Sequence, residues 1–134
     1  MRLSLFLFAV ALLSGCTMHN DIQNNNFPAV VAVAPPANLI GTWTGSIGYY
    51  LATIKIEPSG TGVMCASWSG RDSLNAVKYD GKEVRFSDSS RTTVKKLEDK
   101  LLVLRANYYF GADYTFHRDD ELKQTAPYCI EKFK

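Results

Sequence analysis

The sequence of residues 39–134 predicts an all-β domain. We expect a small antiparallel meander of about eight strands that closes, or nearly closes, into a barrel. Three features lead to this fold class. Short runs place apolar residues at every second position, which is the period of a half-buried strand. Clusters of Gly, Asp and Ser separate these runs. No helical pattern of useful length competes with them.

The predicted strands follow one another closely, at 39–47, 51–57, 62–68, 74–79, 83–87, 92–97, 100–106 and 113–118. Tight turns are expected at 59–62 and at Asp80-Gly81, where residues that tolerate positive φ are found. Glu98-Asp99 makes a further polar reversal. Residues 120–126 are expected to turn once as a helix before Tyr128 and Cys129 return to the sheet.

Alternation assigns the two faces of each strand. Ile54 and Ile56 are expected to face the core, while Thr53, Lys55 and Glu57 point away from it. The same pattern predicts further core pairs at Val84 and Phe86, Leu102 and Leu104, and Tyr114 and Phe116. Closure of the meander would remove exposed strand edges, which favours a barrel over a flat sheet.

The N-terminus has the features of an export signal. Arg2 precedes an apolar run at 3–13, which is too short to cross a membrane because a spanning helix needs roughly 20 residues. The motif Leu13-Ser14-Gly15-Cys16 resembles the bacterial lipobox. That resemblance implies removal of residues 1–15 and attachment of diacylglycerol and a further acyl chain (palmitate) to Cys16. The alternative is an ordinary secretory signal followed by an unrelated cysteine.

Residues 16–38 are expected to form a flexible tether, since an asparagine-rich stretch is followed by Pro35 and Pro36. An alternative concerns 29–34, where an apolar β-branched run could pair as an extra edge strand. Thr17, and not an aspartate, follows the lipidated cysteine. In this respect the sequence resembles lipoproteins sent to the outer membrane, and we expect a periplasm-facing, lipid-anchored protein.

Composition and charge exclude few functions beyond nucleic-acid binding. The apolar fraction of 46% and charged fraction of 21% are ordinary for a folded domain. The formal charge of +2 falls by one, to +1, when Arg2 is removed with the signal. Lys95 and Lys96 form the only paired basic residues of the mature chain, so a nucleic-acid partner has no support.

Two cysteines remain after lipidation, Cys65 and Cys129, and we predict that they pair. Export places them where disulfides form, and one bridge would attach the C-terminal segment to the sheet. Closing a loop of this length stabilises a domain by about 4 kcal/mol in the chain-entropy model.

The sequence offers little catalytic chemistry, and we expect no enzyme, cofactor or metal. His117 is the only histidine of the folded domain. Residues Asp119, Asp120 and Glu121 lack the spacing of a calcium loop and are interpreted as a solvated turn.

Aromatic residues supply the candidate binding site. Tyr49 and Tyr50 follow the first strand, and Tyr108 and Tyr109 follow the seventh. Rings near strand ends suit the mouth of a ligand-holding barrel or the centre of a protein contact. The alternative is that half of each pair is core and half is surface.

Gly41-Thr42-Trp43 resembles the glycine-x-tryptophan start of lipocalin-like barrels, where the tryptophan fills the base. With Gly60-Thr61-Gly62 and Cys65, the domain resembles small bacterial lipoproteins with a lipocalin-like barrel. A comparison with periplasmic lysozyme inhibitors finds no recognisable inhibitory loop.

Two functions follow as hypotheses, and a third, a hydrolase, would require His117 to lie beside an acid and a nucleophile in a cleft. The first is a non-catalytic module that binds a small apolar ligand, with Trp43 and the tyrosines as candidates, and it requires an enclosed apolar cavity. The second is a protein-interaction or inhibitory lipoprotein, which predicts a solid core and an exposed aromatic patch.

Overall fold

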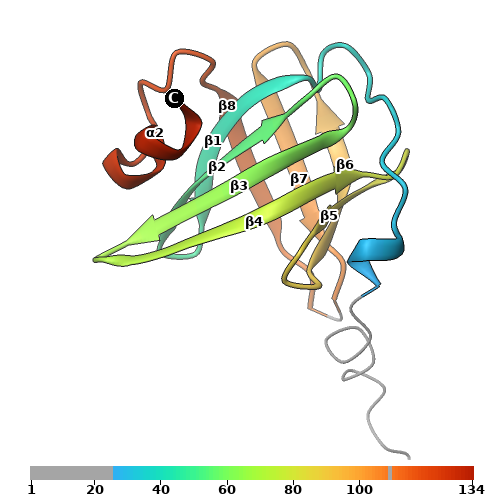
Figure 1. The fold of residues 1–134 in the computed structure, drawn as a ribbon, viewed down its shortest axis with the longest axis horizontal. Coiled ribbons are helices and arrows are strands. Elements are labelled where there is room, and N and C mark those ends of the chain that lie inside the picture. Colours follow the sequence, from blue (N-terminus) through green and yellow to red (C-terminus); the bar gives the residue numbers. More distant parts are fainter. Residues whose placement is uncertain (1–25, 109) are drawn as a thin grey trace, which may run out of the picture.

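The computed structural model describes residues 26–108 and 110–134, and it confirms the predicted fold class. Antiparallel strands form one closed barrel in sequence order, with the last strand paired to the first (Figure 1). The strands are β1 (Gly41–Ile47), β2 (Tyr50–Ile56), β3 (Thr61–Trp68), β4 (Arg71–Tyr79), β5 (Glu83–Phe86), β6 (Arg91–Leu97), β7 (Leu101–Ala106) and β8 (Asp113–Arg118). The predicted signal peptide, the lipobox and Cys16 lie outside the described residues.

The fourth strand begins earlier than predicted, at Arg71 instead of residue 74. Ser69 and Gly70 both adopt positive φ, at 47° and 75°, as a two-residue hairpin turn requires. Because the turn is this tight, β3 and β4 pair up to the Trp68–Arg71 position. The β3–β4 hairpin therefore projects beyond the rest of the barrel (Figure 1).

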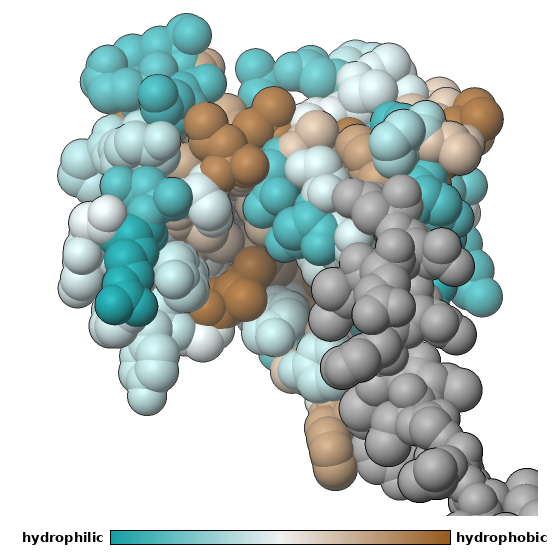
Figure 2. All heavy atoms as spheres, turned by 60° about the horizontal axis from the view of Figure 1, so that its bottom comes forward, coloured by the Kyte–Doolittle hydropathy of each residue, from teal (hydrophilic) through white to brown (hydrophobic). Residues whose placement is uncertain are grey.

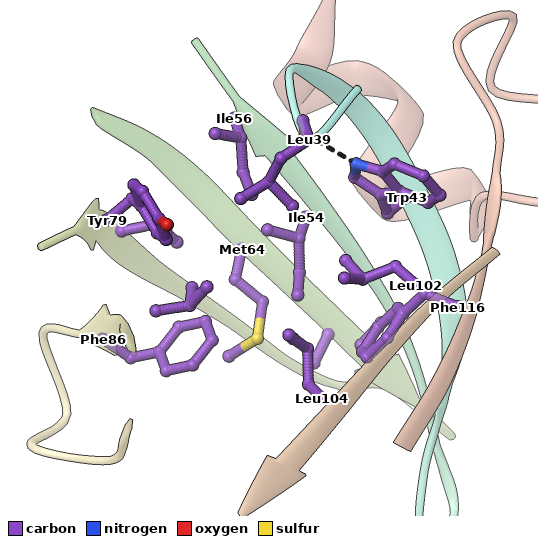
Figure 3. Close-up of a cluster of buried hydrophobic side chains, with 14 residues drawn as sticks. Leu39, Trp43, Ile54, Ile56, Met64, Tyr79, Phe86, Leu102, Leu104 and Phe116 are labelled. Carbon is purple, nitrogen blue, oxygen red and sulfur yellow. Dashed lines mark hydrogen bonds between the residues drawn. The ribbon is translucent and has the colours of Figure 1, made fainter. Parts of the chain in front are cut away.

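The inward faces of the strands form the core, as alternation predicted. Ile54, Ile56, Leu102, Leu104 and Phe116 are at most 1% exposed. Figure 3 shows these side chains packed together with others from all sides of the barrel. Trp43 fills the base, where its indole Nε1 donates a hydrogen bond to the carbonyl oxygen of Leu39 at 2.9 Å.

The C-terminal segment covers part of the outer wall and differs from the prediction. A helix forms at α2 (Pro127–Phe133), whereas the turn expected at 120–126 is not helical. Proline suits the first turn of a helix because its missing N–H has no partner there in any case. The predicted return of Tyr128 and Cys129 to the sheet is therefore wrong.

The predicted disulfide joins Cys65 of β3 to Cys129 of α2, with an S–S distance of 1.98 Å. Together with Ala126, these two buried residues form a small second core on the outside of the barrel. Thr53 points outward as predicted, yet it is fully buried under this cover. The bridge holds α2 against the barrel wall, so the outer face of β2 and β3 is not solvated there.

Residues 26–40 lie against the barrel, although the sequence predicted a flexible tether as far as residue 38. The short 3-10 helix η2 (Phe27–Ala29) lies beside Lys78, whose Nζ is 4.6 Å from the Phe27 ring centroid. Farther along, the Val33 amide donates to the Tyr79 carbonyl at 2.9 Å. The segment pairs through this bond without forming the alternative edge strand at 29–34. We call residues 26–38 the strap.

Candidate ligand-binding mouth

The meander places its turns at two ends of the barrel that differ in chemistry. Since consecutive strands run in opposite directions, the turns β1–β2, β3–β4, β5–β6 and β7–β8 share one end. We call this the aromatic end. The turns β2–β3, β4–β5 and β6–β7 share the other, which we call the charged end because it carries Glu57, Asp80, Lys82, Glu98, Asp99 and Lys100.

Exposed rings gather at the aromatic end. Tyr49 in the β1–β2 turn is 83% exposed, and Trp68 at the end of β3 is 40% exposed. In the β7–β8 loop, Tyr108 is 57% and Phe110 80% exposed. Among the described residues, the turns of the charged end carry no exposed aromatic side chain. One end of the barrel is thus suited to apolar contacts and the other to water.

Trp68 is the centre of an aromatic cluster at the mouth. Its ring stacks on Tyr49 with centroids 5.6 Å apart, and Tyr50 meets it edge-on at 6.0 Å. The Arg71 guanidinium lies 5.7 Å from the Trp68 centroid. This arrangement brings a cation beside an apolar surface, which suits a ligand with an acyl chain and an anionic head group.

The barrel is filled from its base and opens toward the aromatic end. Leu39, Trp43 and Phe116 at the charged end have no exposure. Toward the aromatic end, Ala52 and Leu104 are 0% and 1% exposed, and Met64 and Ala66 retain 7% and 6%. Figure 2 turns this end toward the viewer and shows apolar side chains set among polar ones around a recess. The described interior thus resembles a shallow cup over a solid base more than the enclosed cavity expected of a carrier.

Two different walls line this cup. Ile47, Tyr50 and Tyr114 are half-buried and pack against the core. On β4, Ser73 and Asn75 occupy inward positions opposite Ala66 and Met64, and they are more exposed than the core beneath them. The mouth is therefore apolar on one side and polar on the other.

Tyr114 connects the cup to the exposed β7–β8 loop. Burial raises the pKa of the Tyr114 hydroxyl, and a hydrogen bond with Tyr108 raises it further. This hydrogen bond links the Tyr114 side chain in the cup to the exposed Tyr108 of the loop.

Neighbouring charges on the outer wall are already paired. Asp113 contacts both Lys95 and Arg105, and their hydrogen bonds hold the pKa of this carboxyl below its usual value. Arg71 differs from these two basic groups, since its guanidinium lies over the face of Trp68. Arg71 is therefore better placed than Lys95 or Arg105 to meet an anionic head group at the mouth.

The structure brings three of the predicted site residues to one end and separates the others. Tyr49, Tyr50 and Tyr108 lie at the aromatic end, whereas Trp43 is buried in the base and has no access to a ligand there. Tyr109 lies outside the described residues. Trp68 and Arg71 were missed, and the signal that could have found them is the Ser69-Gly70 turn between them.

The acidic segment has a structural role. Asp119 is 5% exposed and accepts hydrogen bonds from the Lys123 and Gln124 amides and from the hydroxyls of Thr44 and Thr125. The interpretation of Asp119 as part of a solvated turn is therefore wrong, because the C-terminal loop folds over it. An open polar depression here is lined by Arg118, Asp119, Asp120, Glu121, Lys123 and Gln124.

Within the described residues, His117 is not placed beside an accessible nucleophile, and no metal-binding cluster assembles. His117 is exposed on the outer face of β8, opposite Thr44 and Leu101. The Thr44 hydroxyl is buried and bonded to Thr53 and Asp119, away from an accessible cleft. No cluster of three or more His, Cys, Asp or Glu residues suited to a metal ion occurs in 26–108 or 110–134. None of the helices in these ranges is long and apolar enough to cross a membrane.

A closed meander of this size, with Trp43 in its base and an aromatic mouth, defines a small lipocalin-like barrel. The family model of the bacterial lipocalin LPS transport optimiser YedD matches residues 24–133. The chain belongs to this family. Its fold is similar to the crystal structure of a lipoprotein YedD from Klebsiella pneumoniae, with 18% identity and a TM-score of 0.57. That match covers 80% of this chain and 91% of the other. No significant match occurs among curated proteins.

Proposed function

We propose that this protein is a lipid-anchored envelope module, without catalysis, that binds an amphiphile at the aromatic end of its barrel. The observation that carries the proposal is the Trp68 cluster. An exposed indole is flanked by Tyr49 and Tyr50 and covered on one side by Arg71, at the opening of an otherwise solid barrel.

The two walls of the cup indicate the chemical class of the ligand. Ile47, Tyr50 and Tyr114 offer apolar contacts to an acyl chain. Ser73, Asn75 and Arg71 offer hydrogen bonds and a positive charge to a polar head group. The base is packed, so the cup admits the end of a chain and does not enclose a whole lipid.

The family description supports an amphiphile of the envelope. LPS carries acyl chains and anionic phosphates, which are the two features that the mouth accommodates. We propose that the protein acts in LPS transport by contacting LPS, or a lipid of the same chemistry, through its mouth. The lipobox at 13–16 supports removal of residues 1–15 and acylation of Cys16. Thr17, in place of an aspartate after the cysteine, supports anchoring in the outer membrane.

Tryptophan fluorescence tests the proposal, since the chain has only two tryptophans. The mature domain with Cys16→Ser is titrated with dihexanoylphosphatidylglycerol below its micelle concentration. We expect a blue shift of the emission as Trp68 enters an apolar environment. Trp68→Phe should abolish the shift, while Tyr128→Ser, which removes an exposed ring from α2, should leave it unchanged.

The role of Arg71 is tested by comparing an anionic lipid with a zwitterionic one. Arg71→Gln should weaken binding of the anionic lipid more than binding of dihexanoylphosphatidylcholine. Absence of any shift with either lipid would contradict amphiphile binding and would favour a protein partner at the same aromatic surface.

A further inference from the structure

We infer that the aromatic end of the barrel rests on the surface of the membrane that holds the lipid anchor, so that the mouth faces the bilayer. This inference rests on the lipid anchor at Cys16 proposed above, and it adds an orientation to the proposed function. The occupant of the exposed aromatic surface is then lipid.

The two ends of the barrel differ in their exposed aromatic residues. Three turns of the aromatic end carry exposed rings, at Tyr49, Trp68 and the Tyr108–Phe110 loop, while the β5–β6 turn is polar. Tyrosine and tryptophan favour the boundary between lipid and water because each ring has an apolar body and one polar group. The charged end would make unfavourable contact with a bilayer, because its carboxylates and ammonium groups would lose hydration.

The course of the strap gives a second reason. Figure 1 places η2 toward the lower edge of the molecule, on the side of the β5–β6 and β7–β8 turns. From there the strap runs to the charged end, where Val33 bonds to Tyr79 and the chain then enters β1. Phe27, at the start of the strap, lies beside Lys78, one residue before Tyr79 on β4, so the strap covers only part of the distance from the charged end to the aromatic end.

Contacts with the barrel hold the strap along this path. Val33 passes so close to Gly60 that a Cβ there would lie 2.0 Å from the Val33 carbonyl oxygen. Nearer the chain start, Lys78 Nζ donates to the Phe27 carbonyl at 2.9 Å and lies over the Phe27 ring. Because of these contacts, residues 26–38 are held against the barrel and do not lengthen the connection to the anchor.

The connection from the anchor to the strap is short. Nine residues lie between Cys16 and Asn26, so the connection spans at most about 35 Å. A connection from Cys16 to Gly41 would span as much as about 85 Å. The short connection starts at η2, on the side of the β5–β6 turn in Figure 1, so the anchor keeps the domain close to the bilayer surface.

This orientation has a consequence for the ligand. A mouth that faces the leaflet can receive an acyl chain directly from it, with Arg71 at the level of the lipid phosphates. The shallow cup above the packed base suits a lipid that stays mostly in the leaflet, since only the end of one acyl chain has to enter the cup.

The experiment uses the full lipidated protein, purified from membranes and reconstituted into phosphatidylethanolamine and phosphatidylglycerol vesicles with brominated acyl chains. Bromine quenches tryptophan on contact. We expect a loss of emission from the wild type and none from Trp68→Phe, which retains only the buried Trp43. A second reporter, Phe110→Trp in the Trp68→Phe chain, should also be quenched because it lies in a different turn of the same end.

Three results would overturn the inference. Unquenched Trp68 that stays accessible to aqueous acrylamide would show that the aromatic end faces away from the lipid. Quenching at Trp68 but not at position 110 would indicate one bound lipid instead of a docked surface. A mature chain without lipid on Cys16 would remove the anchor. In each case the titration of the soluble Cys16→Ser domain still decides amphiphile binding separately.

Discussion

The hydroxyl oxygens of Thr44 and Thr53 lie 2.8 Å apart across β1 and β2, on the outside of the barrel and out of contact with water. Both also bond to Thr125, and Thr44 donates to the buried carboxylate of Asp119. This polar group attaches the C-terminal loop to the outer wall. With the disulfide, it explains why a face that carries threonines is nevertheless covered.

Replacing the acceptor of this network should destabilise the domain. Asp119→Asn removes the charge and leaves one acceptor oxygen where the carboxylate has two, so we expect the free energy of unfolding to fall by about 2–4 kcal/mol. Urea denaturation measures this loss. The matched control is Glu121→Gln, an exposed position that should change stability little; equal losses for both variants would contradict a structural role for Asp119.

Removal of the disulfide should act mainly on the outer layer. In the Cys65→Ala, Cys129→Ala double variant, the free energy of unfolding is expected to fall by about 4 kcal/mol, as closure of a long loop predicts. Hydrogen exchange should accelerate first in α2, because the bridge is the covalent link between α2 and β3. Faster exchange throughout the barrel, with α2 still protected, would contradict a bridge that mainly holds α2 in place.

The β4–β5 turn should make stability depend on acid pH. Burial alone would raise the pKa of Asp80, but hydrogen bonds from the Glu83 and Lys82 amides and from Arg85 lower this pKa below its ordinary value. A carboxyl whose pKa is lower in the folded state stabilises the protein above its unfolded pKa, near 3.9, and loses that contribution as the pH falls through the folded value.

Asp80→Asn should therefore reduce the free energy of unfolding by about 1–2 kcal/mol at pH 7. The difference from the wild type should narrow below pH 4, as the wild-type carboxylate becomes protonated. Urea titrations between pH 2 and 7 measure the difference. If the difference in the free energy of unfolding stays constant over this range, the charge of Asp80 does not stabilise the domain.

One methyl group added at Gly60 should displace the strap from the barrel. Gly60 has φ +86°, and a Cβ there would clash with the Val33 carbonyl oxygen, so Gly60→Ala should displace residues 26–38. Gly70→Ala is the matched control, because Gly70 has a similar φ of +75° and an added Cβ would meet nothing within 4 Å. Thermolysin should cut the strap faster in Gly60→Ala only; similar rates in both variants would refute the strap contact.

Alternation and turn residues were sufficient to predict the barrel. Each strand with a clear period of two, such as the one that holds Ile54 and Ile56, lies where it was expected and buries the predicted face. This is a local property of the sequence, since side chains on a strand alternate regardless of what pairs with it. The disulfide was predictable as well, because only two cysteines remain to pair once Cys16 is assigned to the lipobox.

Contacts between distant segments were not predictable in the same way. Thr53 has the alternation of an exposed position, and only the C-terminal loop, which reaches it from position 125, makes it buried. Trp68 lies on the inward face of its strand, which suggests a core residue, yet the β3–β4 hairpin extends past the barrel and leaves the ring at the mouth. The strap was predicted as a tether, and pairing of its apolar run at 29–34 was only the alternative. Its bond to Tyr79 is a single backbone contact, which depends on the distant β4 being in reach.

The most direct test of amphiphile binding at the aromatic end is amide chemical-shift mapping of the Cys16→Ser domain titrated with dihexanoylphosphatidylglycerol. We predict that the largest shifts fall on Tyr49, Trp68, Arg71 and Tyr108, with α2 and the turns of the charged end unaffected. Shifts confined to α2 or the charged end, or none at all, would contradict a ligand-binding mouth.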